Sequence, residues 1–481
     1  MKFKVVLNIM GKLLIVLAGF LLTPLIVTWY YHEADYLAFL LPSLLALCVG
    51  LGLSVYTKGH DEISNREGFA IVAMIWVLFS AFGGLPYMIS SPSLSFTDSF
   101  FETMSGFTTT GSSVMQNIQS HTKGILLWRS ITQWIGGMGI IVLSLAILPI
   151  LGIGGMQLFK AEVPGPTSDK LTPKVKDTAK ILWEAYTFLT FLQATLLFFA
   201  GMNPYDAICH SLTTLSSGGF SPNNASVAHY ETSAIHFIIS LFMIFAGVNF
   251  ANHYQFSKRN FHALFNDIEL RAYLGVIFGV CAFLCLNLML TGQYTDLFIC
   301  FRDVIFTTAS MVTTTGFATA DFETWPLFSQ FLIFCLMFTG GCAGSTGGGV
   351  KIVRLIIFLK FAYQQVYQLI HPKAILQLKM NQQVVKTPVI LGVMGFLVLY
   401  VFSFFTGTLI MSATGLDFTS AVTATASCLG NIGPGLALVG PTDNFSQISD
   451  FGKWVLSFLM LLGRLELFTV VILFTPAFWR D

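Results

Sequence analysis

Long apolar runs separated by short polar connections make up most of the chain. The hydrocarbon core of a bilayer is about 30 Å thick, so a helix that crosses it needs about 20 apolar residues. Runs of this kind predict membrane segments near residues 5–29, 36–56, 68–89, 125–152, 180–202, 233–255, 271–292, 327–370 (interrupted), 387–411 and 453–477. The pattern therefore predicts an all-α polytopic membrane protein.

Four further segments are too short and too rich in hydroxyl groups to cross a membrane, yet too apolar to be ordinary solvent loops. Their sequences are SFTDSFFETMSGFTTTG, NPYDAICHSLTTLSSGGF, CFRDVIFTTASMVTTTG and LDFTSAVTATASCLGNIGPG. Unpaired backbone at membrane depth is tolerated only where it is buried in protein or lines water. We therefore expect these segments to re-enter the membrane around one water-lined path.

The four segments form an internal repeat that aligns on Gly111, Gly219, Gly316 and Gly433. A hydroxyl residue stands six positions before each glycine, at Ser105, Thr213, Ser310 and Ser427. An aspartate precedes the first three glycines by 13 residues (Asp98, Asp206, Asp303), whereas Asp417 precedes the fourth by 16, which predicts one extra helical turn there. Each repeat is predicted to contain a membrane helix, a short pore helix opened by an aspartate, a glycine loop and a second membrane helix (M1-P-M2).

This repeat predicts how the chain is divided. An N-terminal transmembrane helix pair occupies residues 1–60, and M1-P-M2 units follow at 61–155, 175–260, 265–370 (with a broken M2) and 380–481. The units are unequal. The second loop, LSSGGF, has two glycines, so Gly218 is a rival of Gly219 for the structural position. The fourth, CLGNIGPGL, has no hydroxyl beside its glycine and carries Pro434, which leaves Asn431 as the expected polar lining.

The residue types in these loops suit a monovalent cation. Rings of backbone carbonyls can replace the hydration shell of an ion without fixed charge. Glycine allows the backbone twists that point successive carbonyls the same way, and threonine hydroxyls can add oxygens or brace the loop from behind. No acidic ring is present, which disfavours a divalent ion. The alternative is that Thr and Gly only let helices pack closely, but this does not predict four copies in register.

Composition and charge exclude several other classes of protein. The chain has 481 residues, of which 54% are hydrophobic and 10% charged, with a net charge of +1. It therefore has no excess of basic residues for nucleic acid. The cysteines at 48, 281, 285 and 335 lie in apolar runs and are expected to be small hydrophobes. The N-terminal run is too long for a signal peptide and lacks a cleavage site. No paired carboxylates or H-x-x-x-H motif share a helix face, so we do not expect an enzyme.

The stretch TGGCAGSTGGGVK, residues 339–351, interrupts the apolar run that follows the third glycine loop. Each glycine inside a helix costs about 1 kcal/mol relative to alanine. The helix is therefore predicted to break, which leaves half-helices at 327–338 and 350–370 around a polar loop that lines a cavity. The alternative is a packing face of small residues.

Arg464 is predicted to lie near the middle of the last membrane helix, where a charge costs about 2.5 kcal/mol even on the lenient insertion scale. It should therefore face protein or water. Glu466 is two residues further on and points to another side of the helix, so a local ion pair is not expected. A structural salt bridge or a snorkelling side chain remains as an alternative.

The remaining lysines and arginines predict the orientation. They concentrate in alternate connections, above all at residues 160–180 and 351–386, whereas the side with the glycine loops has only Lys123, Arg129, Arg302 and Lys453. The positive-inside rule then places both termini in the cytoplasm and the glycine loops outside. The two basic connections could present a surface to a regulatory partner, or could reflect topology alone.

These motifs, taken over the whole chain, resemble the Trk/Ktr/HKT superfamily of potassium transporters, and most closely its bacterial TrkH type. The resemblance implies that four non-identical repeats surround one pore in the bacterial inner membrane, with K⁺ ions in the pore and no covalently bound cofactor. It implies a K⁺ filter formed by Thr109, Thr110, Gly111, Ser217, Gly218, Gly219, Thr314, Thr315, Gly316, Asn431, Ile432 and Gly433. Glycine at position 111 goes with potassium selectivity in this superfamily, where serine is associated with sodium.

The resemblance also implies a gate and partners. The intramembrane gate would consist of Gly340, Gly341, Cys342, Ala343, Gly344, Ser345, Thr346, Gly347, Gly348 and Gly349, with Arg464 as a positive barrier to cations. The implied partners are a TrkA-type cytoplasmic nucleotide-binding subunit, a second copy of the chain in a homodimer, and membrane lipid. The chain itself has no nucleotide-binding motif.

A secondary transporter coupled to protons or sodium is the main rival interpretation. Such a protein needs an intramembrane carboxylate or histidine relay. The candidates are Glu184, His210 and Glu466, and the sequence alone leaves proton coupling open.

Overall fold

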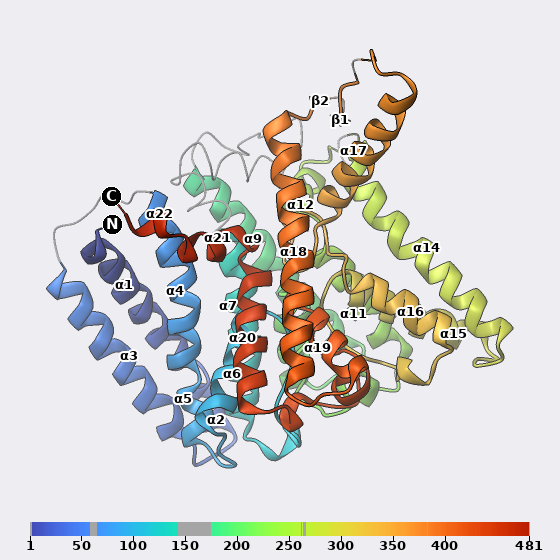
Figure 1. Cartoon of the computed structure of the whole chain (residues 1–481). Coiled ribbons are helices and arrows are strands. Elements are labelled where there is room, and N and C mark those ends of the chain that lie inside the picture. Colours follow the sequence, from blue (N-terminus) through green and yellow to red (C-terminus); the bar gives the residue numbers. More distant parts are fainter. Residues whose placement is uncertain are drawn as a thin grey trace.

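The computed structural model describes residues 2–57, 65–142, 175–260, 262, 266–374, 376–381 and 383–480. Its N-terminal part contains α1 (Phe3–Leu21), α2 (Leu25–Tyr30) and α3 (Tyr36–Tyr56). Helices α1 and α3 cross closely because Gly11 and Gly50 face each other; a Cβ on either would lie 2.8 Å from the other's carbonyl oxygen. This pair packs beside α4 (Asn65–Gly83) at one edge of the molecule (Figure 1).

Helices of membrane length recur along the described residues. By length and composition, six segments can cross a bilayer: Phe3–Tyr30, Tyr36–Tyr56, Arg66–Ile89, Lys180–Phe199, Ile268–Leu290 and Thr387–Ala413. They include α5 (Leu85–Ile89), α9 (Val175–Phe199), α14 (Ile268–Leu290) and α18 (Thr387–Ala413). Only 22–56% of each span is buried within the chain, which leaves apolar surface for lipid or a partner. The predicted all-α membrane fold is confirmed.

Two of the predicted membrane segments, 233–255 and 453–477, are bent in the structure, a feature that the sequence analysis did not predict. Helix α11 (Ser233–Ala246) meets α12 (Phe250–Ser257) at 104°, and α20 (Asp450–Arg464) meets the segment of α21 (Phe468–Val471) at 113°. Gly247 sits at the first bend against the Tyr273 hydroxyl, and Asn249 caps α12. The predicted span 125–152 is described as α7 (Lys123–Val142); its remainder, like residues 61–64 and 160–174, lies outside the described residues.

A short helix precedes each of the four aligned glycines: α6 (Phe96–Phe107), α10 (Pro204–Leu215), α15 (Leu297–Val312) and α19 (Phe418–Gly430). Their N-caps are Ser95, Asn203, Asp296 and Asp417, and each side chain accepts a bond from a backbone amide in the first turn. The extra turn predicted for the fourth helix is therefore wrong. Asp417 is itself the cap, whereas Asp98 and Asp206 lie three residues inside; the helix that begins a turn earlier is α15.

The predicted break after the third glycine loop is confirmed. Helix α16 (Leu327–Leu336) stops, residues 340–349 run without a helix, and α17 (Ile352–Ile370) resumes. Beyond it, β1 (Lys379–Met380) and β2 (Gln383–Val384) form a small hairpin. The shorter elements are η1 (Ile118–Ser120), η3 (Ser226–His229), η4 (Phe322–Thr324), η5 (Ala437–Val439), η6 (Phe445–Gln447), η7 (Ile472–Phe474) and α22 (Pro476–Trp479).

Both termini lie at the same end of the molecule (Figure 1). Phe3 stacks on Trp479 with ring centroids 6.3 Å apart. Arg66 Nη1 donates to the backbone carbonyl of Arg480 at 2.7 Å. The β1–β2 hairpin projects toward this end as well (Figure 1).

Candidate functional site

The four short helices end in the same backbone motif. In each, the amide before the aligned glycine donates to the carbonyl five residues earlier: Thr110 to Ser105 (2.8 Å), Gly218 to Thr213 (2.9 Å), Thr315 to Ser310 (2.8 Å) and Ile432 to Ser427 (2.9 Å). The residue in front of that amide is left-handed, namely Thr109 (φ 53°), Ser217 (56°), Thr314 (58°) and Asn431 (53°). This is the Schellman way of closing a helix, which satisfies its last carbonyls. The hydroxyl residue found at a fixed offset in the sequence thus marks the carbonyl that closes each helix.

The four loops touch one another in a closed circle. A Cβ added to Gly111 would lie 2.2 Å from the Gly218 carbonyl oxygen. A Cβ added to Gly219 would lie 1.9 Å from the carbonyl oxygen of Thr315, and one added to Gly316 would lie 1.9 Å from that of Ile432. A Cβ added to Gly433 would lie 3.0 Å from the carbonyl oxygen of Thr110. Each glycine therefore abuts the carbonyl of the next loop in chain order, and the fourth returns to the first. We call residues 109–111, 217–219, 314–316 and 431–433 the glycine ring.

Only glycine fits at the aligned positions. All four have positive φ: Gly111 (86°), Gly219 (76°), Gly316 (79°) and Gly433 (107°). Side chains rarely adopt this region, and a Cβ would also meet the neighbouring carbonyl. Gly218 is not among the glycines with positive φ, so Gly219 holds the structural position for which the sequence offered two candidates.

The threonine hydroxyls of the ring brace it from behind. Thr110 Oγ1 lies 2.7 Å from Thr108 Oγ1, and Thr315 Oγ1 lies 2.8 Å from Thr313 Oγ1. Of the two roles that the sequence left open for these side chains, the contacts of Thr110 and Thr315 favour the bracing role. The oxygens that face a neighbouring glycine belong to the backbone.

The fourth loop is built differently. Asn431 Nδ2 donates to Thr110 Oγ1 (3.0 Å) and to the Met460 carbonyl (2.9 Å). Its amide thus links the fourth loop to the first and to α20. The carbonyl of Gly433 accepts from the hydroxyls of Ser427 (2.6 Å) and Ser112 (3.0 Å).

The second half of the 340–349 loop packs against the left-handed residues of the ring. Thr346 Oγ1 lies 2.8 Å from Ser217 Oγ, and the Gly348 amide donates to Thr314 Oγ1 at 2.6 Å. A Cβ on Gly348 would lie 2.9 Å from the Cβ of Asn431. The loop therefore contacts three of the four repeats directly at the helix ends.

The first half of the loop is anchored to the α11–α12 bend. The Cys342 amide donates to the Gly247 carbonyl (2.8 Å), and the Phe250 amide donates to the Gly344 carbonyl (3.1 Å). The Ala343 amide donates to Glu269 Oε1 at 2.7 Å. Within the loop, Ser345 Oγ donates to the Cys342 carbonyl. Gly340 packs against Gly348 and Gly341 against Gly247, too closely for a Cβ on either.

Arg464 is the last residue of α20, not a residue of mid-helix as predicted, because the chain turns sharply at Glu466 and Leu467, which have positive φ. Its side chain is 1% exposed, which rules out snorkelling. Arg464 Nη1 donates to the Thr346 carbonyl (2.8 Å) and Nη2 to the Gly136 carbonyl (3.1 Å). The guanidinium thus ties the 340–349 loop to α7.

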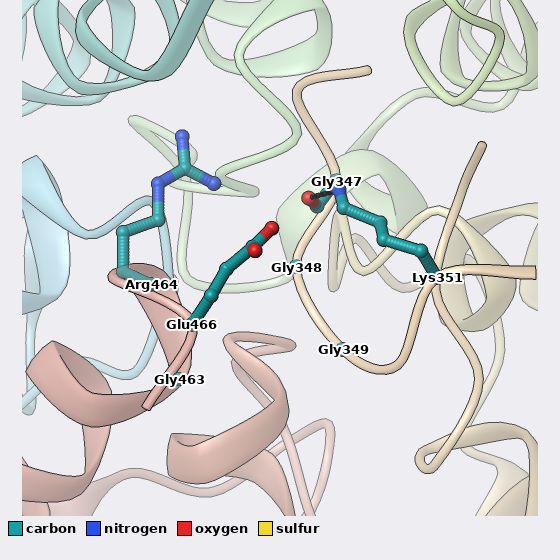
Figure 2. A pocket seen from close by; sticks show the side chains of 7 residues that line it. All are labelled: Gly347, Gly348, Gly349, Lys351, Gly463, Arg464 and Glu466. Carbon is teal, nitrogen blue, oxygen red and sulfur yellow. Dashed lines mark hydrogen bonds between the residues drawn. The ribbon is translucent and has the colours of Figure 1, made fainter. Parts of the chain in front are cut away.

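Two further charged side chains surround the same loop (Figure 2). Lys351 Nζ donates to the carbonyl of Gly347, and Glu466 Oε2 lies 2.6 Å from Arg354 Nη2. As expected, Glu466 makes no local pair with Arg464; its partner lies on α17. A small cavity lies where the 340–349 loop meets the end of α20. It is lined by residues 347–349, Lys351, Gly463, Arg464 and Glu466.

Each of the candidate coupling residues has a partner of its own. Glu184 is paired with Lys180 at 3.8 Å on an exposed side of α9. His210 is buried, with Nδ1 2.8 Å from the Asp206 carbonyl and Nε2 3.1 Å from Ser221 Oγ. Glu466 is bound to Arg354. Each group thus has its own partner, and these contacts do not connect any two of the three groups.

The sequence did not predict a buried ion pair behind the ring. Arg129 on α7 and Glu102 on α6 are 1% and 0% exposed, with Nη2 and Oε1 2.8 Å apart. Arg129 also donates to the Ser221 carbonyl (3.1 Å), and Glu102 accepts from the Val114 amide (2.9 Å). The pair therefore ties the first loop to the second. The signal in the sequence was a charged residue within each of two apolar segments.

Comparisons with known proteins agree with this geometry. The family model TrkH, described as a cation transport protein, matches residues 37–480. The chain is 40% identical to the Trk system potassium uptake protein TrkH of Escherichia coli (strain K12) over 100% of both chains, and 35% identical to TrkG of that strain over 99% of both. The crystal structure of the potassium transporter TrkH from Vibrio parahaemolyticus has a TM-score of 0.92 at 37% identity and covers 100% of both chains. The predicted resemblance and the assignment to transport rather than to an enzyme are confirmed.

Proposed function

The chain belongs to the TrkH family of cation transport proteins, a family of Trk-type potassium uptake transporters, and on that premise we propose that its glycine ring is the potassium selectivity filter. The observation that carries the proposal is the closed circle of contacts, in which each glycine faces the carbonyl of the next loop. Four backbone loops around one axis supply neutral oxygens for an ion that has lost its water. The ring residues include no carboxylate, which suits a monovalent cation.

The 340–349 loop is the gate in this proposal. It lies against the helix ends of three repeats, and Arg464 places a buried positive charge beside it. A cation leaving the filter would meet this loop and then the guanidinium. The arrangement corresponds to a closed pore, which opens when the loop leaves the ring.

We further propose that the chain works in the bacterial inner membrane with both termini in the cytoplasm. The common end of the two termini, together with the basic stretch 351–386, supports this orientation (Figure 1). That end would dock a TrkA-type nucleotide-binding subunit, as the Trk system naming of the relatives suggests. A homodimer would cover part of the apolar surface that the spans leave open.

The test is ion flux into proteoliposomes that hold the purified chain, measured under a K⁺ gradient, a Na⁺ gradient, and each with or without a proton gradient. We expect dissipative flux that prefers K⁺ and ignores protons. Gly111→Ser should raise Na⁺ flux relative to K⁺, because its side chain would meet the Gly218 carbonyl. Gly415→Ser is a matched control, since Gly415 has a similar φ (92°) and open space around it.

Two outcomes would change the proposal. An unchanged ion preference in Gly111→Ser would remove the glycine ring from the filter. Flux that requires a proton gradient would favour the rival, a coupled transporter, and would direct attention to Glu184, His210 and Glu466.

A further inference from the structure

Gln133 on α7 reaches the second loop of the glycine ring. Its side chain is 0% exposed. Nε2 donates to the Gly218 carbonyl oxygen at 2.6 Å, and Oε1 accepts from the Phe220 amide at 3.0 Å. One side-chain amide thus clamps the backbone on both sides of Gly219. The helix that provides it belongs to the preceding repeat.

The orientation of this amide is fixed by its partners. The Phe220 amide is a donor, so the atom that faces it must be the carbonyl oxygen of Gln133. The NH₂ group then necessarily faces Gly218. A Cβ on Gly218 would lie 2.3 Å from Gln133 Cδ. Gly218 is therefore glycine because Gln133 occupies the space that a threonine side chain fills in the first and third loops.

The clamp makes the ring unequal. The Gly218 oxygen that faces Gly111 is the one that Gln133 engages. In the part of the chain that the structure describes, no side chain donates to the corresponding oxygens of Thr110, Thr315 or Ile432. The fourth loop lies opposite the second in the ring. There the carbonyl that accepts side-chain bonds is that of Gly433, one residue further along, and its donors are two serines.

We propose that Gln133 is a specificity-determining residue that acts by positioning the Gly218 carbonyl; the inference rests on the glycine ring being the filter. The partial positive charge of the N–H hydrogen offsets part of the field of that oxygen, and the bond holds the oxygen in place. Without this bond the oxygen would present a stronger field on a looser loop. Both changes favour the smaller Na⁺ ion, because selectivity depends on the fit and on the field strength of the coordinating carbonyls.

The experiment compares Gln133→Leu with the unaltered chain in proteoliposomes, using the ratio of K⁺ to Na⁺ permeability from bi-ionic potentials. We expect the ratio to fall by about three- to tenfold while K⁺ flux persists, because Gln133→Leu removes both hydrogen bonds of the amide. Gln193→Leu is the matched control: Gln193 is also 0% exposed, and neither its Oε1 nor its Nε2 has a partner among the described residues. Its ratio should not change.

A second variant separates the hydrogen bond from the volume. Gln133→Ala combined with Gly218→Thr gives the second loop the threonine of the first and third loops and removes the amide. The ratio should again fall, and this variant also serves if Gln133→Leu does not fold. If Gly111→Ser shifts the ratio but the folded Gln133 variants do not, the role of Gln133 is overturned and the assignment of the filter stands. If Gly111→Ser shifts nothing either, the filter assignment fails and this inference fails with it.

Discussion

The glycine ring and the 340–349 loop lie in contact but are held by different forces. The ring consists of four copies of one backbone motif, each closed by the same amide-to-carbonyl bond and seated against the next copy. The 340–349 loop occurs once. Its first half is held by backbone bonds to the α11–α12 bend, and its second half by the side chains of Arg464, Lys351 and Ser217. Movement of one ring loop would therefore disturb its neighbours, whereas the 340–349 loop, as the proposed gate, would move by exchanging polar contacts.

In the function proposed above, this difference corresponds to a division between selectivity and gating. A filter needs fixed oxygens, which a closed circle of backbone contacts provides. A gate needs two states of similar free energy, and single hydrogen bonds of about 1 kcal/mol are suited to exchange. Variants of the ring should accordingly change which ion passes, and variants of the loop should change how often any ion passes.

The largest effect is expected from alanine at the tightest ring positions. In Gly219→Ala and Gly316→Ala the new Cβ meets a carbonyl at 1.9 Å, whereas in Gly433→Ala the distance is 3.0 Å. We expect K⁺-selective flux to fall by more than about tenfold in the first two, since a left-handed residue alone costs about 1–2 kcal/mol. The flux should fall less in Gly433→Ala. The measurement is K⁺ and Na⁺ flux in proteoliposomes.

Gly292→Ala provides the control for backbone strain. Gly292 has a φ of 74° and nothing within 4 Å of an added Cβ, so it loses stability without touching the ring. Equal damage in Gly292→Ala and Gly219→Ala would mean that strain, not the contact between loops, explains the result.

The next effect concerns the ion pair that ties two loops of the ring together. Arg129→Met leaves Glu102 charged and buried, which should destabilise the fold by about 3 to 5 kcal/mol. The midpoint of thermal unfolding in detergent should drop clearly. The double variant Glu102→Leu/Arg129→Met removes both charges and should recover part of the loss. A double variant no more stable than the single one would contradict the view that the unpaired charge is the cause.

The sequence could predict features that depend on local backbone chemistry. The register of the four glycines and the break after α16 followed from glycine positions alone, because positive φ and loss of helix propensity act on the residue itself. The wrong extra turn at Asp417 had a local cause too. Aspartate is favoured both as an N-cap and inside the first turn of a helix, so the residue type alone does not tell the two positions apart. Contacts between repeats could not be found this way. Gln133 and the Glu102–Arg129 pair join segments that only the folded ring brings together. The bend after Arg464 was missed because Glu466 and Leu467 are not residue types that signal positive φ.

A moderate effect is expected at the 340–349 loop when Arg464 is replaced. Arg464→Ala removes two hydrogen bonds and a positive charge beside the loop. K⁺ flux should rise by about three- to tenfold, because bonds to a charged group are worth about 1.5–3 kcal/mol and part of that is regained with water. The ratio of K⁺ to Na⁺ should stay constant. A changed ratio would place Arg464 in the filter, and an unfolded product would support a purely structural role.

The smallest effect is expected from the Thr346 hydroxyl, which joins the loop to the ring. Thr346 Oγ1 lies 2.8 Å from Ser217 Oγ and 2.9 Å from the Leu215 carbonyl at the end of α10. Thr346→Val keeps the shape and removes the O–H, so K⁺ flux should rise by about twofold to fivefold, the factor of one neutral hydrogen bond. Thr346→Ser retains the hydroxyl and should behave like the unaltered chain. If Thr346→Val changed the ratio of K⁺ to Na⁺ instead, the contact would transmit strain from the loop into the ring, and the division between a fixed filter and a movable gate would not hold at this residue.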